Sequence, residues 1–213
     1  MPQSSRGLIV QFCKAPIPGK VKTRMLSKLS GSQACELHKQ LALTVYKNIS
    51  DVPSNVDYQL WISSDHEWFD TWTNIKSYKI CVQQGDSLGE KLMFTAAEQL
   101  EYYDFVVFVG SDCPFISSSH IHSVCSYMRD GKDLVFIPAI DGGYVLIAVK
   151  KQSLVVFENI SWGTEKVLEE SVKIAENFNL SYIMLDEQSD IDRPEDLMRL
   201  KNLDFSEVFD VDN

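Results

Sequence analysis

The most regular feature of the chain is the succession of short, unbroken apolar runs and longer amphipathic stretches. Runs of aliphatic, β-branched and aromatic residues fall at 8–12, 58–62, 79–82, 105–109, 134–138, 144–149 and 180–185. Helical patterns lie among them at 32–49, 87–100, 117–128 and 165–177. A strand that is apolar at every position, rather than at every second one, is typical of a sheet covered on both faces. The pattern predicts an α/β protein with a mostly parallel sheet between helices.

The first helical stretch shows the pattern most clearly. Leu37, Leu41, Val45 and Ile49 recur every fourth residue, which gives one apolar face. His38 lies outside that row. We therefore expect the row to pack on the sheet and His38 to lie at the surface.

The strand at 105–109 runs directly into Gly110-Ser111-Asp112 and then Pro114. The glycine lets the chain turn, and the proline prevents further pairing. Asp112 therefore stands at the carboxyl end of a central strand, where open α/β sheets bind their ligands. Two interpretations remain open, since such a carboxylate can hold a metal or can cap the following turn or helix.

Positive charge is concentrated at the N-terminal end of an otherwise acidic chain. Residues 1–35 contain no Asp or Glu, but they include Arg6, Lys14, Lys20, Lys22, Arg24 and Lys28. The loop at 13–19, which ends at Gly19, contains two prolines and follows the first strand. A glycine-bearing loop with Lys and Arg is a suitable cradle for phosphate, although a solvated basic turn is the plainer alternative. Because acids are absent, we favour phosphate binding.

The loop at 83–91 leads into the second helical stretch. Ser87 and Glu90 have the spacing of a capping box, which predicts that the helix begins near Ser87. Gly85 and Gly89 have no such explanation, and a glycine in a first helical turn is unfavourable unless something approaches the backbone closely. A nucleotide is one candidate.

Three later segments carry candidate polar groups. Asp141-Gly142-Gly143 reads as a hairpin turn that lies at an edge of the sheet. Asp192 and Glu195 have capping-box spacing beside a proline, whereas Asp190 has no such structural role. The aromatic cluster at 61–72 is better explained by core packing than by sugar stacking.

Composition limits the classes of function. The 213 residues are 45% hydrophobic, which suits one domain spanning 1–213, and the acidic tail at 203–213 is expected to be solvated or loosely docked. A net charge of -10 argues against nucleic acid and anionic membranes as partners. Apolar runs are too short to span a bilayer, no signal-peptide pattern is present, and the five cysteines are scattered, so we expect a cytoplasmic protein with reduced thiols.

Four motifs together resemble one known family in order and spacing. They are Lys14-x-Pro-x-Pro-Gly-x-Val-Lys-Thr-Arg24, Gly110-Ser-Asp-Cys-Pro114, Asp141-Gly-Gly-Tyr144 and Asp190-Ile-Asp-x-Pro-Glu-Asp-Leu197. The chain resembles the glycosyltransferase-like family with the nucleotide-diphospho-sugar transferase (GT-A) fold. It is more distantly similar to the 2-phospho-L-lactate and molybdenum-cofactor guanylyltransferases. The resemblance implies a three-layer α/β/α, Rossmann-like domain that binds a nucleotide or nucleotide-sugar and an unidentified acceptor.

The resemblance also implies roles for individual residues. The nucleotide would lie against Lys14, Gly19, Lys22, Arg24, Gly85, Gly89 and Ser111. Asp112 would hold Mg²⁺ or Mn²⁺, with Asp190 or, alternatively, Asp192 as the second ligand. Lys14, Arg24 and Asp112 would serve catalysis, and Asp141, Gly142, Gly143 and Trp162 would contact the substrate or acceptor.

The chain departs from the family pattern at three positions. Ser87 replaces an aspartate, Lys91 replaces an arginine, and Gly163 replaces the serine of a Trp-Ser-Thr motif. The expected activity is metal-dependent transfer from a nucleotide-diphosphate-sugar donor. The alternatives are nucleotidyl transfer with release of pyrophosphate, and nucleotide binding without catalysis.

Overall fold

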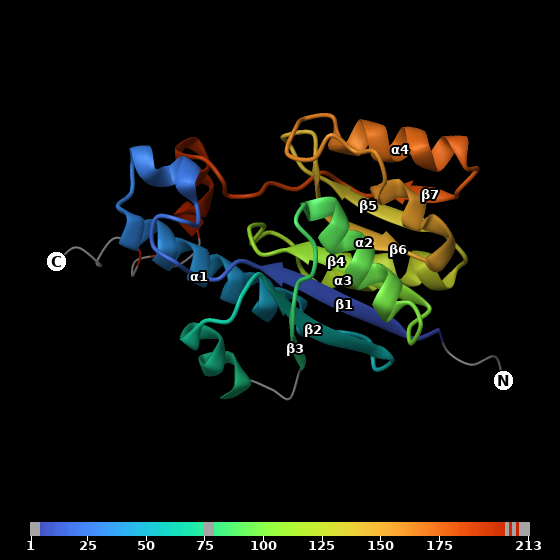
Figure 1. Ribbon diagram of the computed structural model, residues 1–213, viewed down its shortest axis with the longest axis horizontal. Helices are drawn as coiled ribbons and strands as arrows, with labels where there is room; N and C mark the ends of the chain where they lie inside the picture. The colour runs from blue at the N-terminus through green and yellow to red at the C-terminus, as the bar shows by residue number, and fades with distance from the viewer. Residues whose placement is uncertain (1–4, 75–78, 203–204, 206–207, 209–213) are drawn as a thin grey trace.

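The computed structural model describes residues 5–74, 79–202, 205 and 208, and its centre is a seven-stranded sheet with the order β3-β2-β1-β4-β6-β5-β7 (Figure 1). The strands are β1 Gly7–Cys13, β2 Val56–Ile62, β3 Lys79–Val82, β4 Phe105–Gly110, β5 Leu134–Pro138, β6 Tyr144–Val149 and β7 Tyr182–Met184. The helices are α1 Gly31–Ile49, α2 Leu88–Gln99, α3 Ser118–Arg129 and α4 Val167–Asn177. Short 3₁₀ helices are η1 Thr23–Ser27, η2 Glu67–Asn74, η3 Lys151–Phe157 and η4 Pro194–Asn202.

The sheet is mostly parallel, as predicted. β1 pairs in parallel with β2 and β4, β2 with β3, and β5 with β7. β6 is antiparallel to both of its neighbours, β4 and β5. The other six strands therefore end at one edge of the sheet, where β6 begins.

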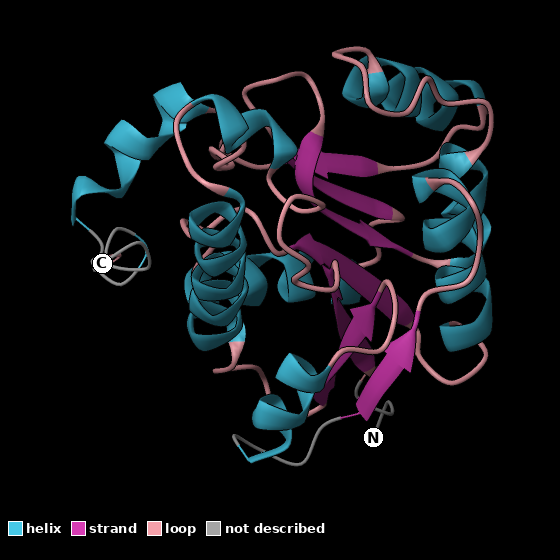
Figure 2. Ribbon diagram, turned by 60° about the vertical axis from the view of Figure 1, so that its left-hand side comes forward, coloured by secondary structure: helices cyan, strands magenta, loops and turns pink. Residues whose placement is uncertain are grey.

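Helices cover both faces of this sheet, which explains why its strands are apolar at every position (Figure 2). Val107 and Val109 of β4 pack with α1 and α3, whereas Val106 and Phe108 pack with α2, α4 and η3. The three-layer α/β/α architecture is confirmed. It exposes the strand ends and their loops, while the strands themselves form the core.

α1 shows how this burial differs from a simple helical pattern. Ser30 and Gln33 form a capping box at its start, and the predicted row of four apolar residues is fully buried. The expectation that His38 lies at the surface is wrong, because its exposure is only 3%. α1 also packs beneath the loop after β1 and the end of β4, so a second side of the helix is enclosed.

The N-terminal basic segment and the C-terminal segment lie side by side, at η1 and η4 (Figure 1). Phe205 and Val208 are buried with Met25 and Leu37 in a small apolar cluster. The acidic residues of the tail, Asp204, Glu207, Asp210 and Asp212, lie outside the described residues. Among the described residues, no helix is long and apolar enough to cross a membrane.

The aromatic stretch after β2 belongs to the core. Trp61, Phe69 and Trp72 are each 3% exposed or less. Trp68 packs against Phe69 and Trp72. The packing interpretation of this cluster is confirmed.

Candidate functional site

The candidate site lies at the edge where six strands end. The chain leaves β1 into the basic loop, β3 into the loop at 83–87, and β4 into Ser111 and Asp112. β7 leads toward Asp190, and the turn before β6 contains Asp141. The topology thus gathers the predicted basic and acidic groups from four parts of the sequence at one edge.

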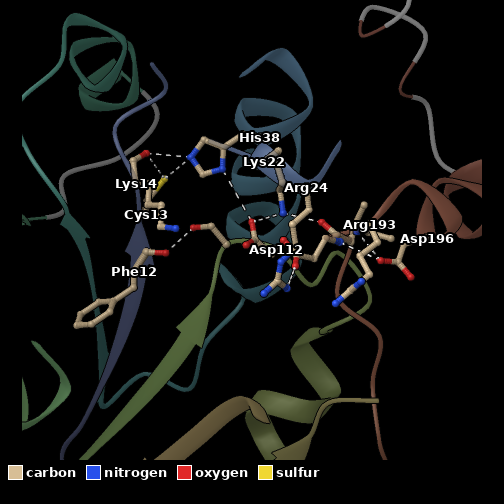
Figure 3. A network of polar contacts seen from close by, with 12 residues as sticks. Phe12, Cys13, Lys14, Lys22, Arg24, His38, Asp112, Arg193 and Asp196 are labelled. Carbon is tan, nitrogen blue, oxygen red and sulfur yellow. Dashed lines mark hydrogen bonds and ion pairs between the residues drawn. The ribbon is translucent and has the colours of Figure 1, made fainter. Parts of the chain in front are cut away.

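Asp112 is the centre of a network of charged groups (Figure 3). The Nζ atom of Lys22 lies 2.7 Å from its Oδ1 atom, and Nδ1 of His38 lies 3.9 Å from the same oxygen. That oxygen is buried, yet the Asp112 side chain as a whole is 45% exposed. One side of the carboxylate is therefore held inside the protein, and the exposed area belongs to its other atoms.

These neighbours keep the carboxylate ionised. Burial alone would raise the pKa of Asp112, but the Lys22 and His38 cations outweigh it and hold that pKa well below its ordinary value. Nε2 of His38 lies 2.9 Å from the backbone carbonyl of Lys14, so this nitrogen carries a proton. Burial lowers the pKa of His38, but the facing carboxylate of Asp112 and the nearby Sγ atom of Cys13 together raise it to about 10.

Lys22 connects three segments of the chain. Its backbone is left-handed, with φ 49° and ψ 39°, which is uncommon for a residue with a side chain. Its side chain is 2% exposed and donates to the carbonyl of Ile191 at 2.5 Å. The Ile191 amide in turn donates to the Asp112 carbonyl at 2.9 Å. The ammonium predicted to bind phosphate is therefore already paired within the protein.

Other cations at this edge are more accessible. Lys14 and Lys20 are exposed, and within the described part of the chain neither makes an ion pair. Arg24 is 53% exposed and pairs with Asp192 at 2.5 Å. Of the predicted phosphate-binding cations, Lys14 is thus the one with an open ammonium.

The pairing with Arg24 corrects the prediction made for Asp192. Its carboxylate does not cap η4 together with Glu195. Instead, the carboxylate of Asp196 accepts from the backbone amides of Asp192 and Arg193 at 3.1 and 2.8 Å. Because the Asp196 carboxylate makes this capping contact, the Asp192 carboxylate is available to pair with Arg24 of η1.

A small cleft of about 160 Å³ opens beside Asp190. Its walls are formed by Ile140, Asp141, Asp190, Asp192, Arg193, Asp196 and Arg199. Burial, together with the charges of Asp141, Asp112 and Asp192, raises the pKa of Asp190 to about 6. Asp190 and Asp112 are thus close enough for their charges to interact.

The carboxylates at this edge suit a divalent metal whose remaining ligands come from a substrate. In the described parts of the chain, no three His, Cys, Asp or Glu side chains form a preformed cage. Mg²⁺ is commonly held by one or two carboxylates together with substrate phosphates, so such a cage is unnecessary. An ionised, half-exposed Asp112 and a nearby Asp190 fit that pattern.

Several predicted contact residues have structural roles. A Cβ atom on Gly89 would lie 2.2 Å from Nε1 of Trp162, so the close approach that this glycine permits is made by the indole. Ser87 and Glu90 form the predicted capping box. Gly85 has φ 112°, and a Cβ there would meet Glu90 at 2.7 Å.

The remaining predicted residues lie in turns at the same edge. Gly142 has φ 87°, and a Cβ there would collide with the Glu165 carbonyl, while Asp141 accepts from the Gly143 amide at 3.1 Å. The hairpin predicted between β5 and β6 is confirmed. Ser111 is buried and donates to the Phe12 carbonyl at 2.7 Å, which links β4 to β1.

Sequence reasoning missed His38 and the pairing of Arg24 with Asp192. His38 is separated from Asp112 by the whole of β2, β3 and α2, so no local spacing connects them. The only signal was a histidine beside the apolar row of α1, which by itself favours a surface position.

Comparisons with known proteins agree with this architecture. The chain is 28% identical over 180 residues to a 2-phospho-L-lactate guanylyltransferase of Methanocaldococcus jannaschii, covering 83% of this chain and 75% of that protein. A crystal structure from Desulfovibrio desulfuricans G20, assigned as a nucleotide-diphospho-sugar transferase, has a TM-score of 0.83 and 28% identity, and the match covers 94% and 90% of the two chains.

A more distant structure shares the fold alone. It is a CMP:2-keto-3-deoxy-manno-octonic acid synthetase complexed with CTP, with a TM-score of 0.61, 12% identity, and coverage of 95% and 100%. The two proteins that are 28% identical to the chain identify it as a nucleotide-dependent transferase. The family model described as "uncharacterized protein conserved in bacteria (DUF2064)" matches residues 52–164, more than half of the chain, and the chain belongs to that family.

Proposed function

We propose that the chain is a nucleotidyltransferase, which moves a nucleoside monophosphate from a nucleoside triphosphate to an acceptor and releases pyrophosphate. The observation that carries the proposal is the ionised, half-exposed carboxylate of Asp112, held at the strand ends close to the basic loop. The guanylyltransferase relative, which aligns over most of the chain, supports the same reaction class.

In this reaction an acceptor oxygen attacks the α-phosphorus, the bond to the β-phosphate breaks, and pyrophosphate leaves with the electron pair. The exposed ammonium of Lys14 would contact the departing phosphates. Lys20, directly after the same loop, is also exposed and could share that role. Cations placed where negative charge develops lower the barrier, and they act most strongly where water is excluded. Lys22 would act indirectly, because its ammonium holds Asp112 in place.

The residues also suit a divalent cation. Asp112 and Asp190 would hold Mg²⁺ or Mn²⁺, which when bound neutralises phosphate charge and orients the triphosphate. The acceptor would approach from the cleft beside Asp190, whose walls include Asp141 and Arg193.

Sugar transfer from a nucleotide-diphosphate-sugar is the second candidate. The solved structure with a TM-score of 0.83 is assigned to that class, which is the reason to retain it. The same cations would then stabilise a nucleoside diphosphate as the leaving group. Binding without catalysis is disfavoured by the likeness to transferases.

Product analysis separates the two reactions. The protein would be incubated with Mg²⁺, a mixture of small-molecule acceptors from a cell extract, and either nucleoside triphosphates or nucleotide sugars. ³¹P NMR would follow the phosphorus-containing products. Nucleotidyl transfer predicts pyrophosphate from a triphosphate, whereas nucleoside diphosphate released from a nucleotide sugar, without any pyrophosphate from triphosphates, would favour sugar transfer instead.

A further inference from the structure

His38 connects the two strands that lead into the site. It lies on α1, and each nitrogen of its ring faces a different strand end (Figure 3). Nε2 is 2.9 Å from the Lys14 carbonyl, directly after β1, and Nδ1 is 3.9 Å from Oδ1 of Asp112, directly after β4. The ring therefore joins the backbone that carries the open ammonium of Lys14 to the carboxylate that would hold the metal.

The ring is carried by a well-packed helix. α1 begins with a capping box, and its apolar row is fully buried, so the helix that carries His38 is anchored in the core. His38 is itself 3% exposed. Nζ of Lys22 lies 2.7 Å from the same oxygen of Asp112, so this buried oxygen faces inward between Lys22 and His38. The exposed area of the Asp112 side chain belongs to its other atoms.

We propose that His38 is a positioning residue, which fixes Asp112 relative to the Lys14 loop so that metal and phosphate are bound together. The proposal rests on the nucleotidyltransferase function proposed above, and it adds a residue to the same site. A histidine that served only to fill the core would leave metal and phosphate binding unchanged when replaced by a residue that preserves folding.

Two substitutions separate the contacts of the ring. In His38→Gln the side-chain amide reaches the place of Nε2, which keeps a donor for the Lys14 carbonyl and removes the group that faces Asp112. In His38→Asn the amide lies at the place of Nδ1, which keeps a donor toward Asp112 and loses the bond to Lys14. His122→Gln is the control, because His122 is exposed on α3 and its Nδ1 atom lies 2.7 Å from the carbonyl of Ser118 in its own helix.

Calorimetry with inorganic pyrophosphate, with and without Mn²⁺, measures both contacts at once. We expect His38→Gln to bind pyrophosphate without metal as tightly as the wild type does. The increase in pyrophosphate affinity that Mn²⁺ causes should be about tenfold smaller in this variant than in the wild type. We expect His38→Asn to keep the enhancement, with metal-free affinity weaker by about fivefold. His122→Gln should match the wild type in both measurements.

The possible failures are distinguishable. If both folded His38 variants match the wild type, His38 is a core residue and the inference is overturned while the proposed function stands. If the wild type binds no pyrophosphate with metal, the proposed function fails, and the inference fails with it. Should both variants unfold, ¹⁵N NMR of the wild-type imidazoles decides: Mg²⁺ and pyrophosphate together should shift the His38 signals but leave those of His122 in place, and unshifted His38 signals would refute the role.

Discussion

Lys22 determines the geometry of the site through a single buried ammonium. It contacts the Asp112 carboxylate and the Ile191 carbonyl, and its backbone is left-handed, which is uncommon for a residue with a side chain. The same loop contains Lys20, which is exposed. Two lysines only two positions apart therefore have different roles, and composition alone gives no means to distinguish them.

Replacing these lysines should produce different losses of stability. Lys22→Ala leaves Asp112 without its nearest cation and leaves the Ile191 carbonyl without its donor, so the free energy of unfolding should fall by about 2–4 kcal/mol. Lys20→Ala should change it by no more than about 0.5 kcal/mol. Urea unfolding measures both values, and equal losses would mean that the buried pair does not stabilise the fold.

Asp190 should make stability depend on pH. Its pKa is raised to about 6 in the folded protein, from an ordinary value of 3.8, so between these values the folded state keeps a proton that the unfolded state has lost. This contribution makes stability fall as pH rises through that window, and below it the effect vanishes. Above about pH 6, Asp190→Asn should therefore melt roughly 2–4 °C higher than the wild type.

The difference between wild type and Asp190→Asn is best followed by thermal melting from about pH 3 to about pH 8. The two melting temperatures should converge below pH 3.8, where the carboxyl group is protonated in both the folded and the unfolded chain. A variant that melts lower than the wild type at neutral pH would indicate that the carboxylate stabilises the fold.

At the scale of elements, the contact between α2 and the segment before α4 depends on the absence of a side chain at Gly89. Trp162 packs with Tyr144 and Phe157 and reaches Gly89 in the first turn of α2. A methyl group at Gly89 would overlap the indole. The contact with Trp162 explains why position 89 is a glycine, whereas the sequence alone left a nucleotide as one candidate reason.

Gly89→Ala should lower the free energy of unfolding by about 1–3 kcal/mol, although alanine is the better helix former by about 1 kcal/mol. In a Trp162→Val background the overlap is absent, and the same substitution should become neutral or stabilising. A double-mutant cycle by urea unfolding tests this. Additive effects of the two substitutions would separate Gly89 from Trp162.

At the scale of the whole molecule, the sequence predicts the layers better than the contacts between them. Unbroken apolar runs such as 105–109 predict strands enclosed by helices, because a strand with a solvated face would alternate. The carboxyl edge follows from parallel order, which places Asp112, Asp141 and Asp190 together. The partner of each group does not follow, since five elements, from β2 to β4, separate His38 from Asp112 along the chain.

The most direct test concerns the carboxylate of Asp112. Nucleotide affinity would be measured by calorimetry with Mn²⁺ and with chelator for the wild type, Asp112→Asn and the control Asp130→Asn, whose carboxylate is exposed at the end of α3. Asp112→Asn leaves the buried ammonium of Lys22 without its counter-charge, which should lower the melting temperature of this variant. Circular dichroism would therefore first verify that Asp112→Asn is folded at the working temperature. We expect Mn²⁺ to strengthen nucleotide binding in the wild type and in Asp130→Asn but to have no effect in Asp112→Asn, and equal enhancement in all three proteins would refute a metal-binding role for Asp112.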